Sequence, residues 1–335
     1  MDKRESLQQA YVERDGVISA SHSHEQCVVQ LRNLQLLCRA NEVFCESGKC
    51  PQHTTLEEAK WQDKADGLIF QCRRCRQSRS IRVNSIFSGS KLPLMTLYRC
   101  MFVCFLRNMS ITEAQSFCML SESAAKSIYR FCKHQISIHI SRQVHQMKLC
   151  SDPTAENVIE VDESLFTHLR GDETTRTRHD TQCWIFGMIE RRTGSFRCIA
   201  VGSDRTAAHL RPILERHVAT HGTNKTIVYT DGAAFYSFID ECGYERRIVN
   251  HQVGFGRGEE TTNHIESLWS QLKSQGRFNS GQNFTTVDQV QHAVNEVCWR
   301  VQNRHGLLET LFASLLRDNY RENSEETLVK YNTLS

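Results

Sequence analysis

From residue 157 onward the apolar positions alternate between a period of two and a helical period. Strands are expected at 157–162, 183–190, 195–202, 226–231 and 245–250. Helices are expected at 206–220, 233–242, 262–274, 291–302 and 307–316. The sequence Arg-Arg-Thr-Gly at 191–194 predicts a hairpin turn between the second and third strands. This half of the chain is therefore predicted to be an α/β domain with hairpins first and helix-covered parallel strands afterwards.

The first half of the chain has mainly a helical period. Helices are expected at 26–39, 94–106, 112–119 and 122–135. The last two are separated by a short turn, in which Ser121 can cap the second helix. This spacing suits a helix-turn-helix, whose second helix would present Lys126, Arg130 and Lys133 to DNA. An ordinary helical hairpin fits the same pattern.

The change of period near Pro153 is the strongest linker signal in the chain, because it separates helical from strand-like sequence. We therefore divide the chain into an N-terminal helical segment, a ribbon, a helical domain, an α/β domain and a polar tail. These parts are expected at 1–42, 43–90, 91–150, 155–318 and 319–335.

The composition is that of an ordinary globular protein, and one segment of the chain is basic without any acid. Of the 335 residues, 39% are hydrophobic, and the longest apolar stretch, 92–106, is too short to span a membrane. The N-terminus lacks the apolar core of a signal peptide, so the 15 cysteines are expected to be reduced thiols inside the cell, with at most one metal site. Residues 67–112 contain no acid but eight Lys and Arg, which predicts a polyanionic partner; a solvated basic face is the alternative.

Two ligand pairs in the ribbon have the spacing of a zinc site. Cys50 and His53 form the first pair, and Cys72 and Cys75 follow after 18 intervening residues. Two such pairs can close a tetrahedral Zn²⁺ site. Cys45 competes with His53 as the fourth ligand. The arginines interleaved with and following the second pair, expected to contact nucleic acid, are Arg73, Arg74, Arg76 and Arg79.

Three carboxylates lie where the predicted elements could bring them together. Asp162 and Asp231 end two expected strands, and Glu266 lies on an expected helix. Carboxylates at fixed points suit Mg²⁺, and paired ions can catalyse phosphodiester chemistry. Asp162 has acidic neighbours at Glu160 and Glu163, which leaves its register open. Taken singly, each acid could equally be a turn residue or a solvated helix residue.

These linked motifs resemble the DDE transposases of the IS1595/ISXO2 group and their Merlin-type eukaryotic relatives. The matching stretches include Val161-Asp-Glu-Ser, Tyr229-Thr-Asp-Gly-Ala-Ala-Phe-Tyr and Thr262-Asn-His-Ile-Glu-Ser-Leu-Trp, within a resemblance that covers about residues 45–318. The resemblance implies an RNase H-like catalytic domain, preceded by a zinc ribbon and a helical, helix-turn-helix-like domain. The order of the expected strands and helices agrees with that fold.

The resemblance also implies an activity: Mg²⁺- or Mn²⁺-dependent cleavage at transposon ends and strand transfer to target DNA. Asp162, Asp231 and Glu266 would form the metal-binding catalytic triad, and Lys273 matches a lysine that often follows the third acid. Asn263 is a rival third residue, and His251 is a weaker candidate for the rim. The partner would be double-stranded DNA, both the transposon terminal repeats and the target. The protein would act on it as a homo-oligomer, in the nucleus or, if the source is not eukaryotic, in the cytoplasm. The alternatives are a catalytically silent DNA-binding protein derived from a transposase and an RNase H-fold nuclease.

Overall fold

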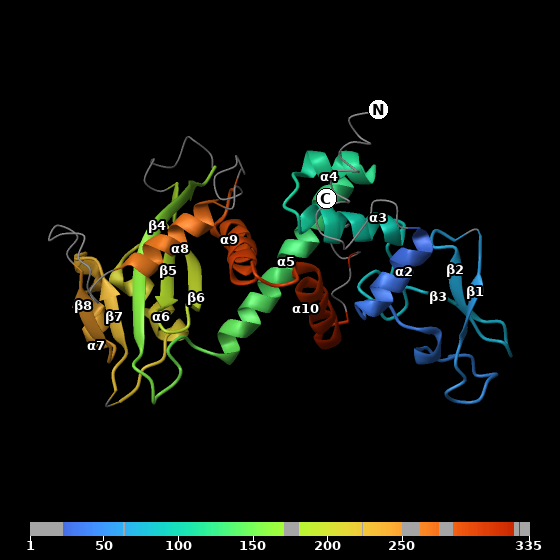
Figure 1. Ribbon diagram of the computed structural model, residues 1–335, viewed down its shortest axis with the longest axis horizontal. Coiled ribbons are helices and arrows are strands. Elements are labelled where there is room, and N and C mark those ends of the chain that lie inside the picture. Colours follow the sequence, from blue (N-terminus) through green and yellow to red (C-terminus); the bar gives the residue numbers. More distant parts are fainter. Residues whose placement is uncertain are drawn as a thin grey trace. The chain divides into compact units, whose positions relative to one another are not determined.

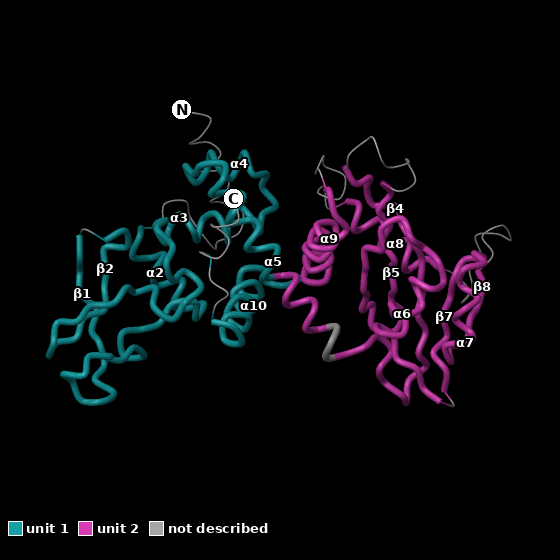
Figure 2. The backbone as a smooth tube through the Cα atoms, turned by 180° about the vertical axis from the view of Figure 1, so that it is seen from behind, with its two compact units in different colours: residues 1–135, 305–335 teal, residues 136–304 magenta. Residues whose placement is uncertain are grey.

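The computed structural model describes residues 23–62, 64–170, 181–222, 224–249, 262–274, 284–324 and 328, apart from the side chains of 144–146 (Figure 1). The chain divides into two compact units, which Figure 2 colours separately. The first unit comprises residues 1–135 and 305–335, and the second comprises residues 136–304.

The second unit is built on a mixed five-stranded sheet in the order β6-β5-β4-β7-β8. Its strands are β4 (Val158–His168), β5 (Gln182–Glu190), β6 (Phe196–Gly202), β7 (Ile227–Thr230) and β8 (Glu245–Ile248). The first three pair antiparallel, whereas β7 and β8 run parallel to β4. All five predicted strands are confirmed, and the hairpin turn before β6 contains Gly194 at a φ of +67°, which glycine adopts without strain.

Helices cover both faces of this sheet. They are α6 (Ala207–His217), η3 (Ala234–Ser237), α7 (Phe238–Glu241), α8 (Asn263–Ser274) and α9 (Val287–Gln302). One apolar cluster joins the sheet to α8 and α9, and another joins its opposite face to α6, η3 and α7. In β5, Cys183 and Ile185 belong to the first cluster, while Phe186 and Met188 belong to the second, as the period of two requires.

The first unit combines a small sheet with helices. The antiparallel strands are β1 (Glu57–Lys60), β2 (Leu68–Gln71) and β3 (Ser78–Ser80). The helices are α2 (His24–Asn33), η1 (Ala40–Glu42), α3 (Leu94–Tyr98), the π-helical η2 (Arg99–Phe105), α4 (Ile111–Cys118) and α10 (Leu308–Glu322). The helix predicted at 94–106 is thus present as α3 and η2 together.

The two helices of the expected helix-turn-helix are present as α4 and α5 (Glu122–Gln146). Between them Met119 is left-handed, with a φ of +53°, and the N–H of Ala124 donates to Ser121 Oγ at 3.2 Å. This capping contact confirms the predicted start of the second helix. The helix continues well beyond residue 135, the predicted end, and the boundary between the two units falls within it. Among the described residues, no helix combines the length and apolarity needed to cross a membrane.

The C-terminal helix α10 differs from the sequence prediction in extent and in membership. It belongs to the first unit rather than to the α/β domain, and it continues past residue 319, where a polar tail was expected. Asn319 is fully buried, and its Nδ2 donates to the main-chain O of Gln135 at 2.9 Å and to its Oε1 at 2.8 Å. A polar residue buried through such a long-range pair does not register in a hydrophobic pattern.

Candidate functional site

Strands β4 and β7 bring the first two carboxylates to the same level of the sheet. β4 does not end at Asp162, as predicted, but continues to His168, so Asp162 lies inside the strand. The parallel ladder pairs Glu160 with Tyr229, and the same register continued by two residues sets Asp162 level with Asp231. Asp231 directly follows β7, and its Oδ1 accepts from the N–H of Ala233 at 3.0 Å.

The first turn of helix α8, which carries Glu266, is bound directly to β4. The buried Glu160 accepts from the Ile265 N–H at 2.9 Å through Oε2, and its Oε1 lies 2.8 Å from His264 Nδ1. The Arg191 side chain donates from Nε to the same Oε1 at 2.7 Å. Glu160 therefore fixes the position of α8 through a charge-assisted network.

Trp269 joins the same helix to Asp162 itself. It lies on the inward face of α8, and its indole Nε1 donates to Asp162 Oδ2 at 2.9 Å. The helical period of 262–274 agrees with the buried position of Trp269, but it gives no indication of this hydrogen bond. Glu160 and Asp162 lie two positions apart, on the same face of β4, which is the signal that could have identified both as contacts of α8.

The carboxylates interact electrostatically. Burial raises the pKa of Asp162, and the negative charges of Asp231 and Glu266 raise it further. The hydrogen bonds from Trp269 and from the backbone N–H of Glu163 act in the opposite direction, since they stabilise the charged form. Asp162 thus lies close enough to Asp231 and to Glu266 to be repelled by both.

Glu163 has a different environment from its neighbour. Its Oε1 accepts a hydrogen bond from the hydroxyl of Tyr236 on η3, on the opposite side of the sheet from α8. Burial raises the pKa of Glu163 to about 7, while this hydrogen bond lowers it and the charge of Asp162 raises it. With Glu160 and Glu163 each held by its own partners, Asp162 is the acid of this strand that interacts with both Asp231 and Glu266.

The remaining predicted catalytic residues lie on or near α8. Glu266 and the rival Asn263 are both exposed in its first turn, and Lys273 is exposed two turns after Glu266. His251 lies outside the described residues. Glu266 is thus at the end of α8 that is bound to β4, whereas Lys273 is at the other end of the helix.

A separate cluster of four thiols occupies the ribbon of the first unit. The Sγ atoms of Cys45, Cys50, Cys72 and Cys75 all lie within 4.8 Å of one another and could hold a metal ion. The pairs Cys45–Cys75 and Cys50–Cys72 are 3.5 Å and 3.7 Å apart. Elsewhere in the described residues, the three carboxylates included, no group of potential ligands is gathered this closely.

The fourth member of this cluster corrects the predicted ligand set. Cys45 takes the place expected for His53, whose ring instead packs edge-on against Phe44 with 5.4 Å between ring centroids. His53 has a φ of +63° and lies in the turn that ends its Cys-Pro-Gln-His stretch. Sequence spacing allowed both residues, and the path of the backbone decides between them.

Backbone amides stabilise the negative charge of two of these thiols. The N–H of Gln77 lowers the pKa of Cys75 to about 6, and the N–H of Cys75 is the main cause of the lowered pKa of Cys72. Backbone donors that favour the thiolate orient such side chains for metal binding.

The basic residues predicted to bind nucleic acid differ in their partners. Arg73 pairs with Glu57, Arg79 with Glu46, and Lys126 with Glu122. Arg74 and Arg76 are exposed, while Arg130 has contacts within the chain.

One charge of the basic block is not on the surface at all. Arg82 is buried and forms two hydrogen bonds with Asp66, at 2.5 Å and 2.6 Å. It therefore serves the core of the first unit, and the basic surface is smaller than the sequence indicated.

The second unit resembles a known domain family. Residues 154–301, less than half of the chain, match the model of the ISXO2-like transposase domain. A solved structure described as a pre-cleavage Mos1 transpososome aligns over 97% of this chain and 93% of that chain, at 10% identity and a TM-score of 0.24. A score this low carries no argument about the fold. A comparison with curated proteins gives no match.

Proposed function

We propose that this chain is a DDE-type DNA transposase, which cleaves DNA at transposon ends and joins the freed 3′-hydroxyl to target DNA. The observation that carries the proposal is that the segment similar to an ISXO2-like transposase domain contains all three interacting acids, Asp162, Asp231 and Glu266. The strand order β6-β5-β4-β7-β8 supports an RNase H-like assignment for this unit, because it combines antiparallel hairpins with parallel strands and has helices on both faces.

The three carboxylates have the chemistry of a site for Mg²⁺ or Mn²⁺. Their mutual repulsion, which contributes to the raised pKa of Asp162, would be relieved by a divalent cation, and hard cations prefer carboxylate oxygen. When bound, such ions stabilise the attacking and leaving oxygens of a phosphodiester displacement. We therefore assign Asp162, Asp231 and Glu266 as the ligands.

Other residues of the chain would position these ligands and the DNA. Trp269 holds one carboxylate oxygen of Asp162 and so orients this carboxylate for a cation. Glu160 fixes the start of α8 and hence the position of Glu266. Lys273, exposed on the same helix, would contact a DNA phosphate beside the site.

In the first unit we propose a structural zinc site at Cys45, Cys50, Cys72 and Cys75. A tetrahedral site with Zn–S bonds of about 2.3 Å needs sulfur atoms roughly 3.8 Å apart. The observed 3.5 Å and 3.7 Å separations agree with that requirement. Zinc would stabilise a ribbon whose strands have only three or four residues each.

DNA is the proposed partner, bound in part by this ribbon. Arg74 and Arg76 are exposed beside the thiol cluster and available for phosphate. The ion pairs of Arg73, Arg79 and Lys126 are on the surface and are weak, so phosphate could replace the carboxylate in each. Two DNA ends require two active sites, which favours a homo-oligomer on DNA. We also propose nuclear action if the source is eukaryotic.

The proposal is tested with a supercoiled plasmid that carries candidate terminal repeats, incubated with Mg²⁺ and a second, unmarked plasmid. Wild-type protein should nick at the repeat ends and form joined products. Asp231→Asn should lower both activities by at least about 100-fold, because it removes a ligand charge. Asp288→Asn is the matched control, since Asp288 is exposed in the first turn of α9.

Two other outcomes would each contradict a transposase function. Cleavage without joining would identify an RNase H-fold nuclease. Equal binding by wild type and Asp231→Asn, with neither protein nicking the plasmid, would identify a silent DNA-binding protein.

A further inference from the structure

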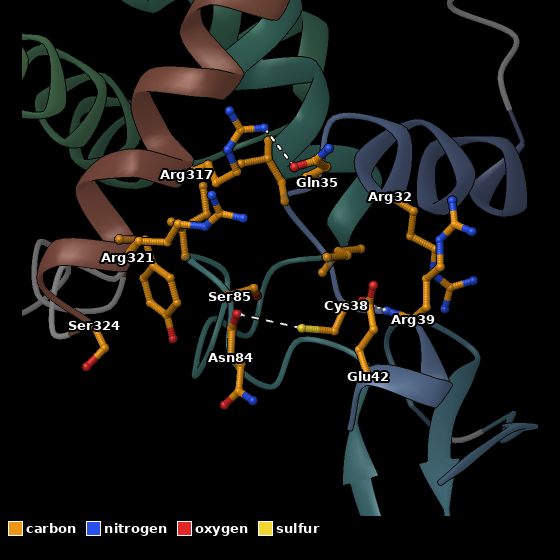
Figure 3. A pocket seen from close by; sticks show the side chains of 14 residues that line it. Arg32, Gln35, Cys38, Arg39, Glu42, Asn84, Ser85, Arg317, Arg321 and Ser324 are labelled. Carbon is orange, nitrogen blue, oxygen red and sulfur yellow. Dashed lines mark hydrogen bonds between the residues drawn. The ribbon is translucent and has the colours of Figure 1, made fainter. Parts of the chain in front are cut away.

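The first unit contains a cleft of about 700 Å³ that is remote in sequence from the proposed catalytic residues. Its walls come from the end of α2 with the segment that follows it, from residues 84–86, and from the last turns of α10. Figure 3 shows Arg317 and Arg321 on one side of it and Arg32 and Arg39 on the other. A volume of this size is typical of sites for small ligands.

The lining is strongly basic. Four arginines face a single carboxylate, Glu42, among the lining residues. In the part of the chain that the structure describes, Arg39 and Arg321 take part in no ion pair, and both are exposed. Repulsion among guanidinium groups favours the binding of a multiply charged anion.

The other two arginines are held in place by the fold. Arg317 donates from Nη1 to Gln35 Oε1 at 2.9 Å and from Nη2 to Ser314 Oγ at 2.9 Å. Those partners are neutral, and its ion pair with Asp318 is long, at 3.5 Å, so most of its charge is uncompensated. A guanidinium already ordered by hydrogen bonds loses little further entropy when an anion binds.

Arg32 provides an independent indication of a missing acceptor. Its Nη2 pairs with Glu58, but its Nε is buried and has no hydrogen-bond partner among the described residues. A buried donor without an acceptor is costly, so the guanidinium of Arg32, beside the cleft, is left with incomplete hydrogen bonding.

The polar groups beside the arginines narrow the ligand class. Asn84, Ser85 and Ser324 line the same cleft, as Figure 3 shows, and add neutral amide and hydroxyl groups. Arginine forks combined with such groups match the several oxygens of a phosphate better than a single carboxylate. We propose that this cleft is a phosphate-binding site for a multiply charged ligand, either the backbone of a nucleic acid or a free polyphosphate.

The experiment measures binding of inorganic pyrophosphate and of a labelled 20-base-pair duplex to the full-length chain, without divalent cations. Arg321→Gln and the double variant Arg317→Gln/Arg321→Gln should weaken pyrophosphate binding by about tenfold per guanidinium lost. Lys64→Gln removes an exposed charge elsewhere in the same unit and should change the affinity less than twofold. Because Arg321 is exposed and unpaired, its single variant tests the site even if the double variant unfolds.

Binding of the duplex distinguishes a nucleic acid backbone from a free polyphosphate as the ligand. If the site holds a nucleic acid backbone, the Arg321 variant also weakens duplex binding, and pyrophosphate competes with the duplex. If it holds a free polyphosphate, duplex affinity is the same in wild type and variant. Pyrophosphate affinity that is unchanged in both variants overturns the proposal. The proposed transposase activity is not touched by that result, since no triad variant is involved.

Discussion

Gly187 of β5 is the position at which one methyl group should disturb the proposed metal site most directly. It is the ladder partner of Asp162 on β4. A Cβ added there would lie 2.6 Å from both Cζ2 and Cη2 of Trp269 and 3.1 Å from Cδ1 of Ile265. Trp269 is only 6% exposed, so its ring cannot swing into solvent without leaving the core.

The cost of Gly187→Ala follows from these contacts. Forcing a methyl into a packed core costs about 1–3 kcal/mol. Displacing the indole also strains or breaks the hydrogen bond from Trp269 to Asp162, and a bond to a charged group contributes about 1.5–3 kcal/mol. Since the two effects share one displacement, we expect a loss of about 2–4 kcal/mol in the free energy of unfolding of the second unit.

Urea unfolding of the second unit, with the far-UV circular dichroism signal as the readout, gives this free energy. Gly222→Ala is the control, because a Cβ there meets no atom within 4 Å. Gly187→Ala should also bind Mn²⁺ about 10–100-fold more weakly than wild type, as expected when the group that orients a ligand is displaced. If Gly187→Ala and Gly222→Ala unfold at the same urea concentration, the packing argument for Asp162 is refuted.

Three further experiments test other contacts. Glu160→Gln should lower the free energy of unfolding of the second unit, measured in urea, by about 2–4 kcal/mol, because an amide cannot accept from all the buried donors that contact Glu160. A variant as stable as wild type would contradict the role of Glu160 in holding α8. Cys45→Ser should lower the zinc content, measured by atomic absorption, from one ion per chain towards none. His53→Ala should leave the zinc content unchanged. The opposite result would favour the ligand set predicted from the sequence, with His53 as the fourth ligand. Asn319→Leu should destabilise the first unit by about 1–3 kcal/mol, because it removes the two buried hydrogen bonds that Asn319 donates to Gln135. An unchanged melting temperature would contradict this.

The α/β domain was largely predictable because its signals are local. Apolar runs with a period of two, turns and helix starts predicted every strand of the five-stranded sheet and the helices that cover it, and their order placed Asp162 near Asp231. The length of β4 was not predictable, since Ser164 and Thr167 interrupt its apolar pattern while the antiparallel ladder with β5 continues through them. Asp162 therefore lies within a strand rather than at its end.

The errors concern contacts between residues far apart in sequence. The basic block at 67–112 contains no acid, but Arg82 is neutralised by Asp66, which immediately precedes the block. Arg73 and Arg79 likewise pair with Glu57 and Glu46 from outside it. A charge count within a sequence window cannot reveal such partners.

The most direct test of the central claim is a calorimetric titration of the full-length chain with Mn²⁺. Wild-type protein and the control Asp288→Asn should bind the ion with equal affinity. Asp231→Asn and Glu266→Gln should each weaken binding by at least about tenfold, because each removes one of the interacting charges. Equal affinity in all four proteins would show that the three carboxylates do not form a metal centre, and it would contradict the account.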